Sequence, residues 1–436
     1  MTMPAGPPGA EDPTAHLWLP YTQMKTTPPP LAVVATDGAR IELADGRWLI
    51  DGVSSWWTAC HGYNHPHIRA AVQRQLGLMP HVMLGGLVHE PAQSLARRLA
   101  AMLPGTLSRV FFSDSGSVAV EVAMKMALQY FINRGESKRC KFIAFTHAYH
   151  GDTIGAMSVC DPHEGMHARF AGVLPQQHVV TLPRSAAQFD AFDAFLNDHA
   201  HECAAIIMEP LVQGAGGMKF HSPEVLAAIR TRAGQHGLLF VLDEIMTGFG
   251  RTGTMFACEQ AAIVPDIITV SKALTGGTMA LAATVATEQV FDAFLSDDPD
   301  AALMHGPTYM ANPLACAAAN ASLDLFETEP RLAQVAAIEA HLAAALEPCR
   351  ELPGVLDVRV KGAIGAVQLE NLDANHWLKS RFVEEGVWVR PFGDIVYLMP
   401  PFTIGADECA VLTGAVVKVI GEWSQNKRPQ HGSEGR

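Results

Sequence analysis

The chain has 436 residues, of which 49% are hydrophobic and 17% are charged, and its formal net charge is −13. A negative balance of this size argues against nucleic acid or an anionic membrane as the partner, because both carry negative charge themselves. The length favours two or three domains rather than one.

The N-terminal segment and the cysteines both favour a cytoplasmic protein. Residues 1–13 are rich in Pro and Gly and lack the basic and apolar stretches of a secretory leader, so we expect a loose arm there. No apolar segment reaches membrane-spanning length. The eight cysteines are scattered singly without a C-x-x-C pair, which is typical of reduced thiols. We therefore expect a soluble cytoplasmic protein.

The first half of the chain indicates an α/β fold. Residues 31–51 alternate in the manner of a strand, and from about residue 109 to 290 short apolar runs alternate with helical segments. Alternation of this kind predicts a mostly parallel sheet with helices on both faces. The predicted strands are residues 109–112, 141–145, 204–208, 238–242, 266–270 and 281–286, and the predicted helices are 118–131 and 222–235.

The C-terminal part has a different pattern, which indicates a smaller α+β lobe. An Ala/Leu-rich helical stretch runs from about residue 318 to 348, and a polar tail is expected from 424 to 436. Strands are predicted at residues 355–360, 365–369, 387–389 and 395–399. We expect three parts, namely residues 1–60 as an arm and a segment packing on the small domain, 61–318 as the large domain, and 319–436 as the small domain.

Two polar residues follow predicted strands and are the first candidates for function. Asp243 comes directly after the run 238–242, and Lys272 comes just after the run 266–270. The carboxyl ends of parallel strands meet at the functional edge of an α/β sheet. A lysine imine with a carboxylate on the ring nitrogen is the arrangement that holds a pyridine cofactor. The ordinary alternatives are a surface lysine and a salt-bridged acid, but the shared position favours function.

The segment Ser-Asp-Ser-Gly-Ser at residues 113–117 lies between a predicted strand and a predicted helix. Small residues and free N–H groups at a helix N-terminus suit a phosphate, but serine-capped helix starts are common without one. Residues 214–217 (Gly-Ala-Gly-Gly) follow Glu209-Pro210 and lack the G-x-G-x-x-G pattern. We therefore do not expect a nicotinamide cofactor.

Aromatic and histidine-rich segments allow several interpretations. Tyr149 follows a predicted strand and is suited to stack on a ring, although a core tyrosine is the default. The histidines at residues 147–150 and 61–67 fit no zinc spacing, so no metal is expected there. The paired tryptophans of residues 54–57 suit either a core or the wall of a pocket for an aliphatic chain or an adenine ring.

Two further residues are candidates for binding anions. Thr308 precedes a helix expected to start near Asn312 and is suited to hydrogen-bond a phosphate. Arg390 stands in an apolar, strand-like setting, where an arginine needs an anion. A substrate carboxylate and an internal salt bridge are equally compatible with that setting.

The motif that starts at Asp243 resembles a known signature. The segment reads Asp243-Glu244-x-x-Thr247-Gly248-Phe249-Gly250-Arg251-Thr252-Gly253, with Lys272 downstream. It is similar to the class III aminotransferases of fold type I, which use pyridoxal 5′-phosphate. The resemblance covers roughly residues 15–420, and it narrows to the members that act in biotin biosynthesis through residues 18–21, 54–57, 113–123, 305–313 and 389–392.

The resemblance implies a seven-stranded, mostly parallel sheet in the large domain and a homodimer with shared active sites. Lys272 and Tyr21 would be the catalytic residues, and Arg390 would pair with the carboxylate of a keto acid. The implied cofactor-binding residues are Gly116, Ser117, Tyr149, Asp243 and Lys272, with Pro307 and Thr308 from the other subunit. The implied substrate-binding residues are Tyr21, Trp56, Tyr149, Asp152, Arg251, Lys272, Gly306 and Arg390.

One position departs from the wider family. Many relatives have Gln where this chain has Met246, and Met cannot donate the hydrogen bond that the Gln makes near the cofactor. The resemblance thus implies transfer of the amino group of S-adenosylmethionine to 8-amino-7-oxononanoate rather than an ornithine or 4-aminobutyrate reaction. Two alternatives remain open: another class III enzyme that acts on an ω-amino acid or moves an amine within one substrate, and a non-catalytic pyridoxal-phosphate-binding protein.

Overall fold

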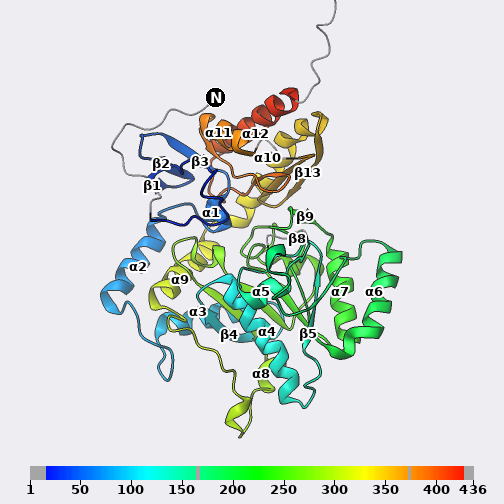
Figure 1. The fold of residues 1–436 in the computed structure, drawn as a ribbon. Coiled ribbons are helices and arrows are strands. Elements are labelled where there is room, and N and C mark those ends of the chain that lie inside the picture. The colour runs from blue at the N-terminus through cyan, green and yellow to red at the C-terminus, as the bar shows by residue number, and fades with distance from the viewer. Residues whose placement is uncertain (1–15, 164–166, 372–374, 427–436) are drawn as a thin grey trace, which may run out of the picture.

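The computed structural model describes residues 16–163, 167–371 and 375–426 (Figure 1). The elements gather in a larger lower part and a smaller upper part, which holds β1–β3 together with α10–α12 (Figure 1). None of the described helices is both long and apolar enough to cross a bilayer. The predicted N-terminal arm, residues 1–13, lies outside the described residues.

A seven-stranded sheet forms the centre of the larger part. Its strands, in sheet order, are β4 (Leu107–Ser113), β12 (Ala282–Thr287), β11 (Ile267–Val270), β10 (Leu239–Asp243), β7 (Cys203–Met208), β5 (Lys141–Phe145) and β6 (His178–Val180). From β11 to β6 all neighbours pair in parallel, whereas β12 runs antiparallel to both β11 and β4. The prediction of a mostly parallel sheet is confirmed, and β6 is the strand that the sequence pattern did not reveal.

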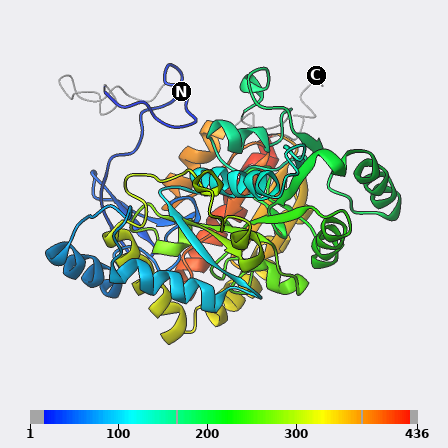
Figure 2. The same ribbon diagram turned by 90° about the horizontal axis from the view of Figure 1, so that it is seen from below.

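The continuous apolar runs form these strands because both faces of the sheet are covered. All six residues of β7 are buried, as are all five of β10. On β10, Val241 packs with the helix α4 side of the core, and its neighbours Phe240 and Leu242 pack with the opposite side. The view in Figure 2 shows helices on both sides of the sheet. This is the burial pattern of a parallel sheet between two helical layers.

Of the helices of the larger part, the sequence pattern predicted two before residue 300, and both are found in type and approximate position. The predicted helices at 118–131 and 222–235 are found as α4 and α7. The set is α2 (Pro66–Leu78), α3 (Glu90–Met102), α4 (Gly116–Asn133), α5 (Ile154–Ser158), α6 (Ala186–His199), α7 (Pro223–Gln235), α8 (Glu288–Asp292) and α9 (Pro313–Thr328). The predicted boundary between residues 318 and 319 falls inside α9, which packs against α2 and α3.

The smaller part contains strands from both the N-terminal and the C-terminal segments of the chain. Its first sheet has the order β1 (Val33–Asp37), β2 (Arg40–Leu43), β3 (Trp48–Asp51) and β15 (Val387–Trp388), with β15 parallel to β3. The early segment thus pairs with the C-terminal part through β3 and β15. A second, antiparallel sheet contains β13 (Val355–Lys361), β14 (Ile364–Leu369) and β16 (Ile395–Leu398).

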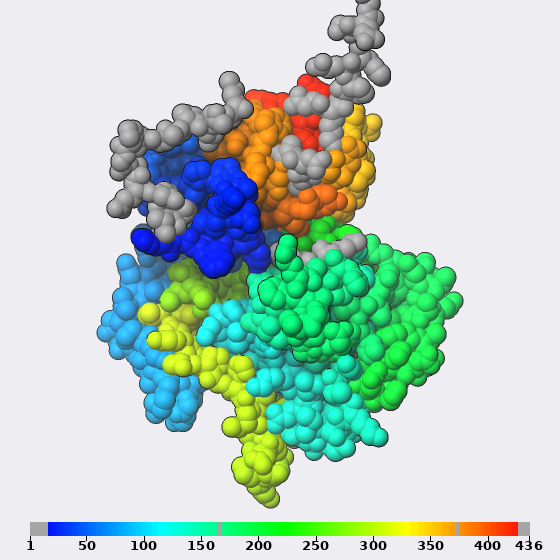
Figure 3. Space-filling model, in the orientation of Figure 1, coloured from blue at the N-terminus to red at the C-terminus, as the bar shows by residue number. Residues whose placement is uncertain are grey.

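Three helices accompany these sheets: α10 (Arg331–Leu346), α11 (Asn375–Glu384) and α12 (Ala406–Asn426). Because α12 ends at Asn426, the predicted polar tail starts three residues inside a helix, and the rest of it lies outside the described residues. In Figure 3 the dark-blue N-terminal segment lies across the junction of the two parts.

The remaining elements are short. They are α1 (Ser54–Trp57), β8 (Val212–Gln213), β9 (Lys219–Phe220) and the 3₁₀ turns η1 (Ala168–Phe170), η2 (Ala200–Glu202), η3 (Ala257–Ala261), η4 (Lys272–Thr275), η5 (Pro299–Ala301) and η6 (Glu347–Glu351). The α1 turn is unusual because its four residues, none of them glycine, have φ between 48° and 73°. The buried Asp51 holds it by accepting hydrogen bonds from the N–H groups of Val53 (2.8 Å) and Ser55 (2.9 Å).

Candidate active site

Lys272 stands at the carboxyl end of β11, where the chain turns sharply into η4. Its φ of +46° is a left-handed conformation that L-residues rarely adopt. Its Nζ lies 4.1 Å from the centre of the Trp57 ring. Burial lowers the pKa of Lys272 to about 8, although the carboxylates of Asp243, Glu209 and Asp152 oppose the shift. A larger fraction of the amine is therefore neutral near physiological pH than for a surface lysine, as a nucleophile requires.

Asp243 is the last residue of β10, the strand next to β11, and it is 4% exposed. Its Oδ2 lies 2.7 Å from Nδ1 of the buried His150. Its Oδ1 accepts hydrogen bonds from the N–H of Ile245 (3.1 Å) and the hydroxyl of Thr269 (3.3 Å). These three partners fix the direction of the carboxylate, which suits it to hold a protonated ring nitrogen.

The start of α4 supplies the third component. Ser115 caps the helix by accepting a hydrogen bond from the N–H of Val118 (3.3 Å), so the capping interpretation of residues 113–117 is correct. Gly116 and Ser117 open the helix and line the same cavity as Asp243 and Lys272. The first N–H groups of a helix have no partner within it and attract anions. Capping and phosphate binding are thus compatible here.

Two connected cavities contain most of the predicted residues. The smaller, of about 140 Å³, is lined by Gly116, Ser117, Tyr149, Asp243, Met246 and Lys272, among others. The larger, of about 880 Å³, shares Tyr149 and Lys272 with it and adds Tyr21, Trp56, Asp152 and Arg390. Lys272 therefore lines both cavities where they adjoin.

A hydrogen-bonded cluster surrounds Asp152 at this junction. Tyr149 donates its hydroxyl to Asp152 (3.0 Å), Tyr21 donates to the other carboxylate oxygen, and Nε2 of His167 lies 2.9 Å away. These bonds, with that of His167 the largest, lower the pKa of Asp152. Burial in turn raises the pKa of Tyr149. The cluster thus places one stable negative charge beside two hydroxyl groups.

Arg390 lies at the larger cavity with its guanidinium 4.8 Å from the centre of the Trp56 ring. Within the described part of the chain it forms no hydrogen bond and no ion pair, so the internal salt bridge considered for it is not found. Lys379 lines the same cavity, and burial together with the charge of Arg390 lowers the pKa of Lys379. Two cations beside one cavity suit an anionic group of a ligand.

Four predicted residues do not line these cavities. Arg251 is 1% exposed and donates to the backbone carbonyls of Pro400 (2.8 Å) and Ala363 (3.4 Å), with its guanidinium 4.4 Å from the Phe402 ring centre. It therefore connects the loop after β10 to the smaller part. Gly306, Pro307 and Thr308 lie in the partly exposed segment before α9. Their predicted roles depend on a second subunit.

Glu209 and His167 are among the residues of the site that were not identified from the sequence. Glu209 is buried beside Tyr149 and accepts hydrogen bonds from the N–H groups of Tyr149 (3.2 Å) and Gly214 (2.9 Å). Burial raises its pKa to about 7. Its position directly after β7 was a usable signal, since Asp243 follows its own strand in the same way. His167 had no such signal, because only the fold brings it onto Asp152.

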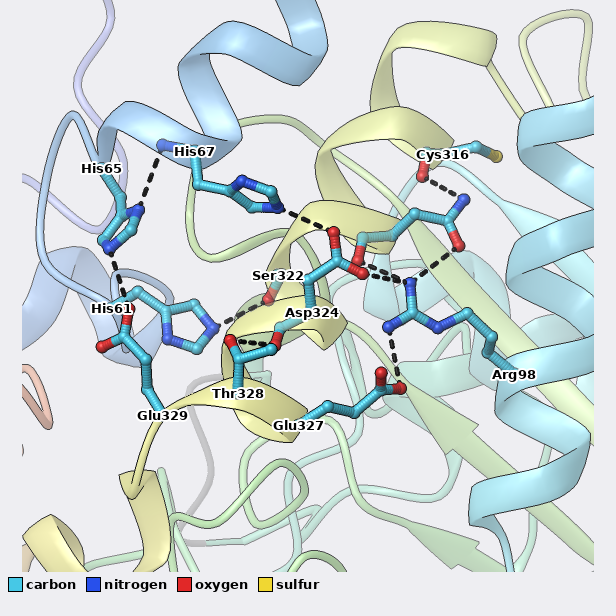
Figure 4. A network of polar contacts seen from close by, with 11 residues as sticks. His61, His65, His67, Arg98, Cys316, Ser322, Asp324, Glu327, Thr328 and Glu329 are labelled. Carbon is cyan, nitrogen blue, oxygen red and sulfur yellow. Dashed lines mark hydrogen bonds and ion pairs between the residues drawn. The ribbon is translucent and has the colours of Figure 1, made fainter.

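The backbone behind Lys272 is held by a chain of buried hydrogen bonds, part of the polar network in Figure 4. Arg331 donates from Nε to Nδ1 of His61 (3.0 Å), and Nε2 of His61 lies 3.0 Å from the hydroxyl of Ser322. Ser322 donates to the carbonyl of Ala273 (3.3 Å), the residue after Lys272. Because an arginine only donates hydrogen bonds, the donor and the acceptor of every bond in this series are fixed. Burial lowers the pKa of His61 to about 3, so it stays neutral.

The residues around the smaller cavity fit a pyridoxal phosphate. His150 lines it, and its buried Nε2 has no partner among the described residues. A Cβ on Gly116 would lie 2.9 Å from Cδ1 of Ile245, so this glycine lets the start of α4 pack closely beside the smaller cavity. An amine, a carboxylate and a helix N-terminus converge there. Together with the sheet they define a pyridoxal-phosphate-dependent enzyme of fold type I.

The comparisons with known proteins give the family. The family model "Aminotransferase class-III" matches residues 21–420, and the chain belongs to this family. It is a transaminase, and its cofactor is pyridoxal 5′-phosphate. The resemblance drawn from the motif at Asp243 is thereby confirmed.

The relatives are similar over nearly their whole length. The adenosylmethionine-8-amino-7-oxononanoate aminotransferase of Mycobacterium leprae is 46% identical over 424 residues, which cover 95% of this chain and 96% of the relative. A solved structure of the enzyme so described from Methanocaldococcus jannaschii has a TM-score of 0.88 at 32% identity, covering 93% of this chain and 97% of that one. An (S)-enantioselective omega-transaminase from Thermomicrobium roseum has a TM-score of 0.87 at 29% identity, covering 94% and 96%.

Proposed function

We propose that this transaminase transfers the amino group of S-adenosylmethionine to 8-amino-7-oxononanoate, giving 7,8-diaminononanoate in biotin biosynthesis. The observation that carries the proposal is Arg390 on the aromatic wall of the larger cavity, which has no anionic partner among the described residues. The proposed acceptor has a carboxylate at one end of a long aliphatic chain and an amino ketone at the other. Arg390 suits the carboxylate, and Trp56 and Phe392 supply apolar wall for the chain.

The charge on Asp152 supports the same pair of substrates. Both carry a positively charged amino group, and Asp152 stays ionised through its bonds from Tyr21, Tyr149 and His167. The hydroxyls of Tyr21 and Tyr149 are 3.3 Å apart and add polar contacts without a fixed charge. A donor and an acceptor that differ this much must use the same cavity in turn, and charged groups of both signs line it.

The chain's own residues supply the remaining chemistry. When bound, pyridoxal phosphate acts as an electron sink for the carbanion formed at the substrate carbon. Lys272 supplies the amine that holds the cofactor and moves a proton from the donor carbon. Asp243 holds the ring nitrogen in its protonated form, and Gly116 and Ser117 bind the phosphate. Tyr149 lines the same cavity and would contact the ring.

Offering amino donors one at a time tests the proposal. The holoenzyme is mixed with S-adenosylmethionine, lysine, ornithine or glutamate without a keto acid, and the cofactor absorbance is followed. We expect S-adenosylmethionine to convert the cofactor and 8-amino-7-oxononanoate to restore it. Conversion by glutamate or an ω-amino acid but not by S-adenosylmethionine would overturn the proposal. It would favour the alternative, an ω-transaminase, to which the similarity with the Thermomicrobium enzyme also points.

We further propose a homodimer in which the partner completes each site. Met304 is 77% exposed and Tyr309 is 59% exposed, on either side of Gly306, Pro307 and Thr308. The segment from 78 to 88 adjoins them, since the rings of His81 and Tyr309 are 4.6 Å apart, and its Leu78, Met83, Leu87 and Val88 are also exposed. Large apolar side chains that are exposed close together on a single chain are typical of a surface that another chain covers.

A cytoplasmic location accords with this function. The eight cysteines are all unpaired, and seven of them are buried. Free thiols in this number support a reducing compartment.

A further inference from the structure

Three potential metal ligands converge at the edge of the large sheet, on the sequence segments of β6, α6 and η2. His178 begins β6, His199 ends α6, and Glu202 ends η2. Nε2 of His178 lies 2.9 Å from Oε1 of Glu202, and Nδ1 of His199 lies 3.3 Å from the same oxygen. Their ligand atoms all lie within 4.8 Å of one another. Figure 1 shows α6 on the outer edge of the larger part.

We propose that His178, His199 and Glu202 bind a zinc ion. Imidazole nitrogen and carboxylate oxygen are ligands that zinc prefers, with bonds of about 2.0–2.2 Å. In a tetrahedral site, bonds of that length place the ligand atoms about 3.3 Å apart. The two nitrogen–oxygen distances of 2.9 and 3.3 Å already approach this spacing. Zinc can therefore enter with small side-chain adjustments.

The ligands are held by the protein rather than free to rotate. The Phe195 ring contacts both imidazoles, with ring centres 5.3 Å from His178 and 4.7 Å from His199. The two imidazoles are themselves 4.8 Å apart. The backbone carbonyl of Glu202 accepts a hydrogen bond from the N–H of Cys140 (2.9 Å), next to the start of β5. Rigid ligands lose little entropy on binding a metal.

Access and charge also suit a cation. The three side chains are between 23% and 41% exposed, so water can reach the ion and fill the fourth position. A neighbouring positive side chain, Arg139, already pairs with Glu136 and donates to the carbonyls of Ala200 and Cys203. Glu202 supplies the negative charge.

The site would serve stability rather than catalysis. His178 is at the first residue of β6, and β6 runs parallel to β5, whose last residue precedes the segment that carries Tyr149. The cluster is therefore at the end of the strands opposite to Lys272. A bound zinc would connect the edge strand β6 to the end of α6.

Calorimetric titration of the chelator-treated holoenzyme with zinc chloride tests the proposal. We expect His178→Ala to lose one equivalent of zinc binding, or to bind it at least about tenfold more weakly, relative to the wild type. His67→Ala is the matched control, because His67 pairs with Asp324 at 2.7 Å but belongs to no group of three potential metal ligands among the described residues. That variant should bind zinc like the wild type.

Thermal unfolding gives a second readout. Zinc should raise the Tm of the wild type and of His67→Ala but not that of His178→Ala or Glu202→Gln, the latter preserving size and hydrogen bonding at residue 202. Equal zinc stoichiometry and equal Tm shifts in all four proteins would overturn the proposal and leave the cluster as a set of hydrogen bonds. Neither readout uses substrates, so the result is independent of the proposed reaction.

Discussion

At the scale of single residues, the environment of Lys272 sets when its amine can react. Burial lowers the pKa of Lys272 to about 8 from the ordinary 10.5. Since only the unprotonated amine attacks the cofactor, we expect the rate at which apoenzyme takes up pyridoxal phosphate to rise with pH and to level off above about 8. Cofactor absorbance after mixing measures this rate. A rate that keeps rising to the pKa of a free lysine would contradict the assignment, and Lys272→Ala should show no such absorbance.

Arg390 gives a second prediction at this scale. Its guanidinium has no protein anion among the described residues, so removing it leaves no buried carboxylate unpaired and should not unfold the protein. We expect Arg390→Ala to weaken use of the keto acid by about 2–5 kcal/mol if the ion pair with substrate is desolvated. Steady-state kinetics with the keto acid varied measure the loss.

The controls separate charge from general damage. Arg390→Lys keeps the charge and should recover part of the activity. Arg47→Ala removes an arginine whose one ion pair within the described part of the chain is with Asp45 on the surface, and it should behave as the wild type. Unchanged KM and kcat in Arg390→Ala would place the substrate carboxylate elsewhere.

The sequence identified the residues whose position follows from the strand pattern. Asp243 and Lys272 each come just after an apolar run, and parallel strands bring such residues to one edge. His167 and Lys379 were missed because they lie on segments whose own pattern says nothing of the cavity. Arg251 is a different case. Its place in the motif implied contact with substrate, whereas its side chain donates to backbone carbonyls of the smaller part. A motif establishes that a residue matters but not which partner it has.

At the scale of elements, α9 supports the turn that carries Lys272. Its Ser322 donates to the carbonyl of Ala273 and also contacts His61. Ser322→Ala would remove one of the donors to the Ala273 carbonyl and leave Nε2 of the buried His61 without a partner among the described residues, which costs about 1–3 kcal/mol. We expect lower stability together with faster loss of cofactor, measured by thermal unfolding and by dilution into a cofactor trap.

A buried serine far from the site is the control for this prediction. Ser424 is also 2% exposed or less and donates to the carbonyl of Pro353 at 2.7 Å. Ser424→Ala should lower stability to a similar degree without changing cofactor loss. Equal rates of cofactor loss in the two variants would show that Ser322 has no specific effect on the Lys272 turn.

Most elements were predictable because burial on both faces produces continuous apolar runs. β5 was predicted with both ends correct, and β7 and β10 to within one residue at each end. β6 was missed because its three residues are only partly buried. The left-handed α1 turn had no signal either, since none of its residues is glycine and the bonds from Asp51 that hold it come from outside the turn.

At the scale of the whole molecule, the site is assembled from segments far apart in the sequence. Tyr21 comes from the N-terminal segment, Lys272 from the large sheet and Arg390 from the segment after β15, and all three line one cavity. The pairing of β3 with β15 brings the N-terminal and C-terminal segments together beside this cavity. No local sequence pattern predicts that these segments converge. The type of reaction was therefore easier to infer from the sequence than the identity of the substrate.

The proposed dimer extends this assembly to a second chain. If Thr308 acts in the partner's site, a mixed dimer of Lys272→Ala and Thr308→Asp has one site with both changes and one site with neither. We therefore expect two inactive variants to regain activity when mixed, measured on dimers isolated through two different affinity tags. The aspartate repels the phosphate, so Thr308→Asp alone should be nearly inactive.

A matched mixture shows whether the regained activity comes from a site with an intact lysine. Lys272→Ala combined with a chain that carries both Lys272→Ala and Thr308→Asp should stay inactive, because no site then has the lysine. If Thr308 served its own chain's site, the first mixed dimer would hold one site without Lys272 and one with the altered Thr308, and it would remain inactive. An inactive mixed dimer, or a chain that stays monomeric in solution, would therefore contradict the shared site, whereas recovered activity requires that residues of two chains meet around one cofactor.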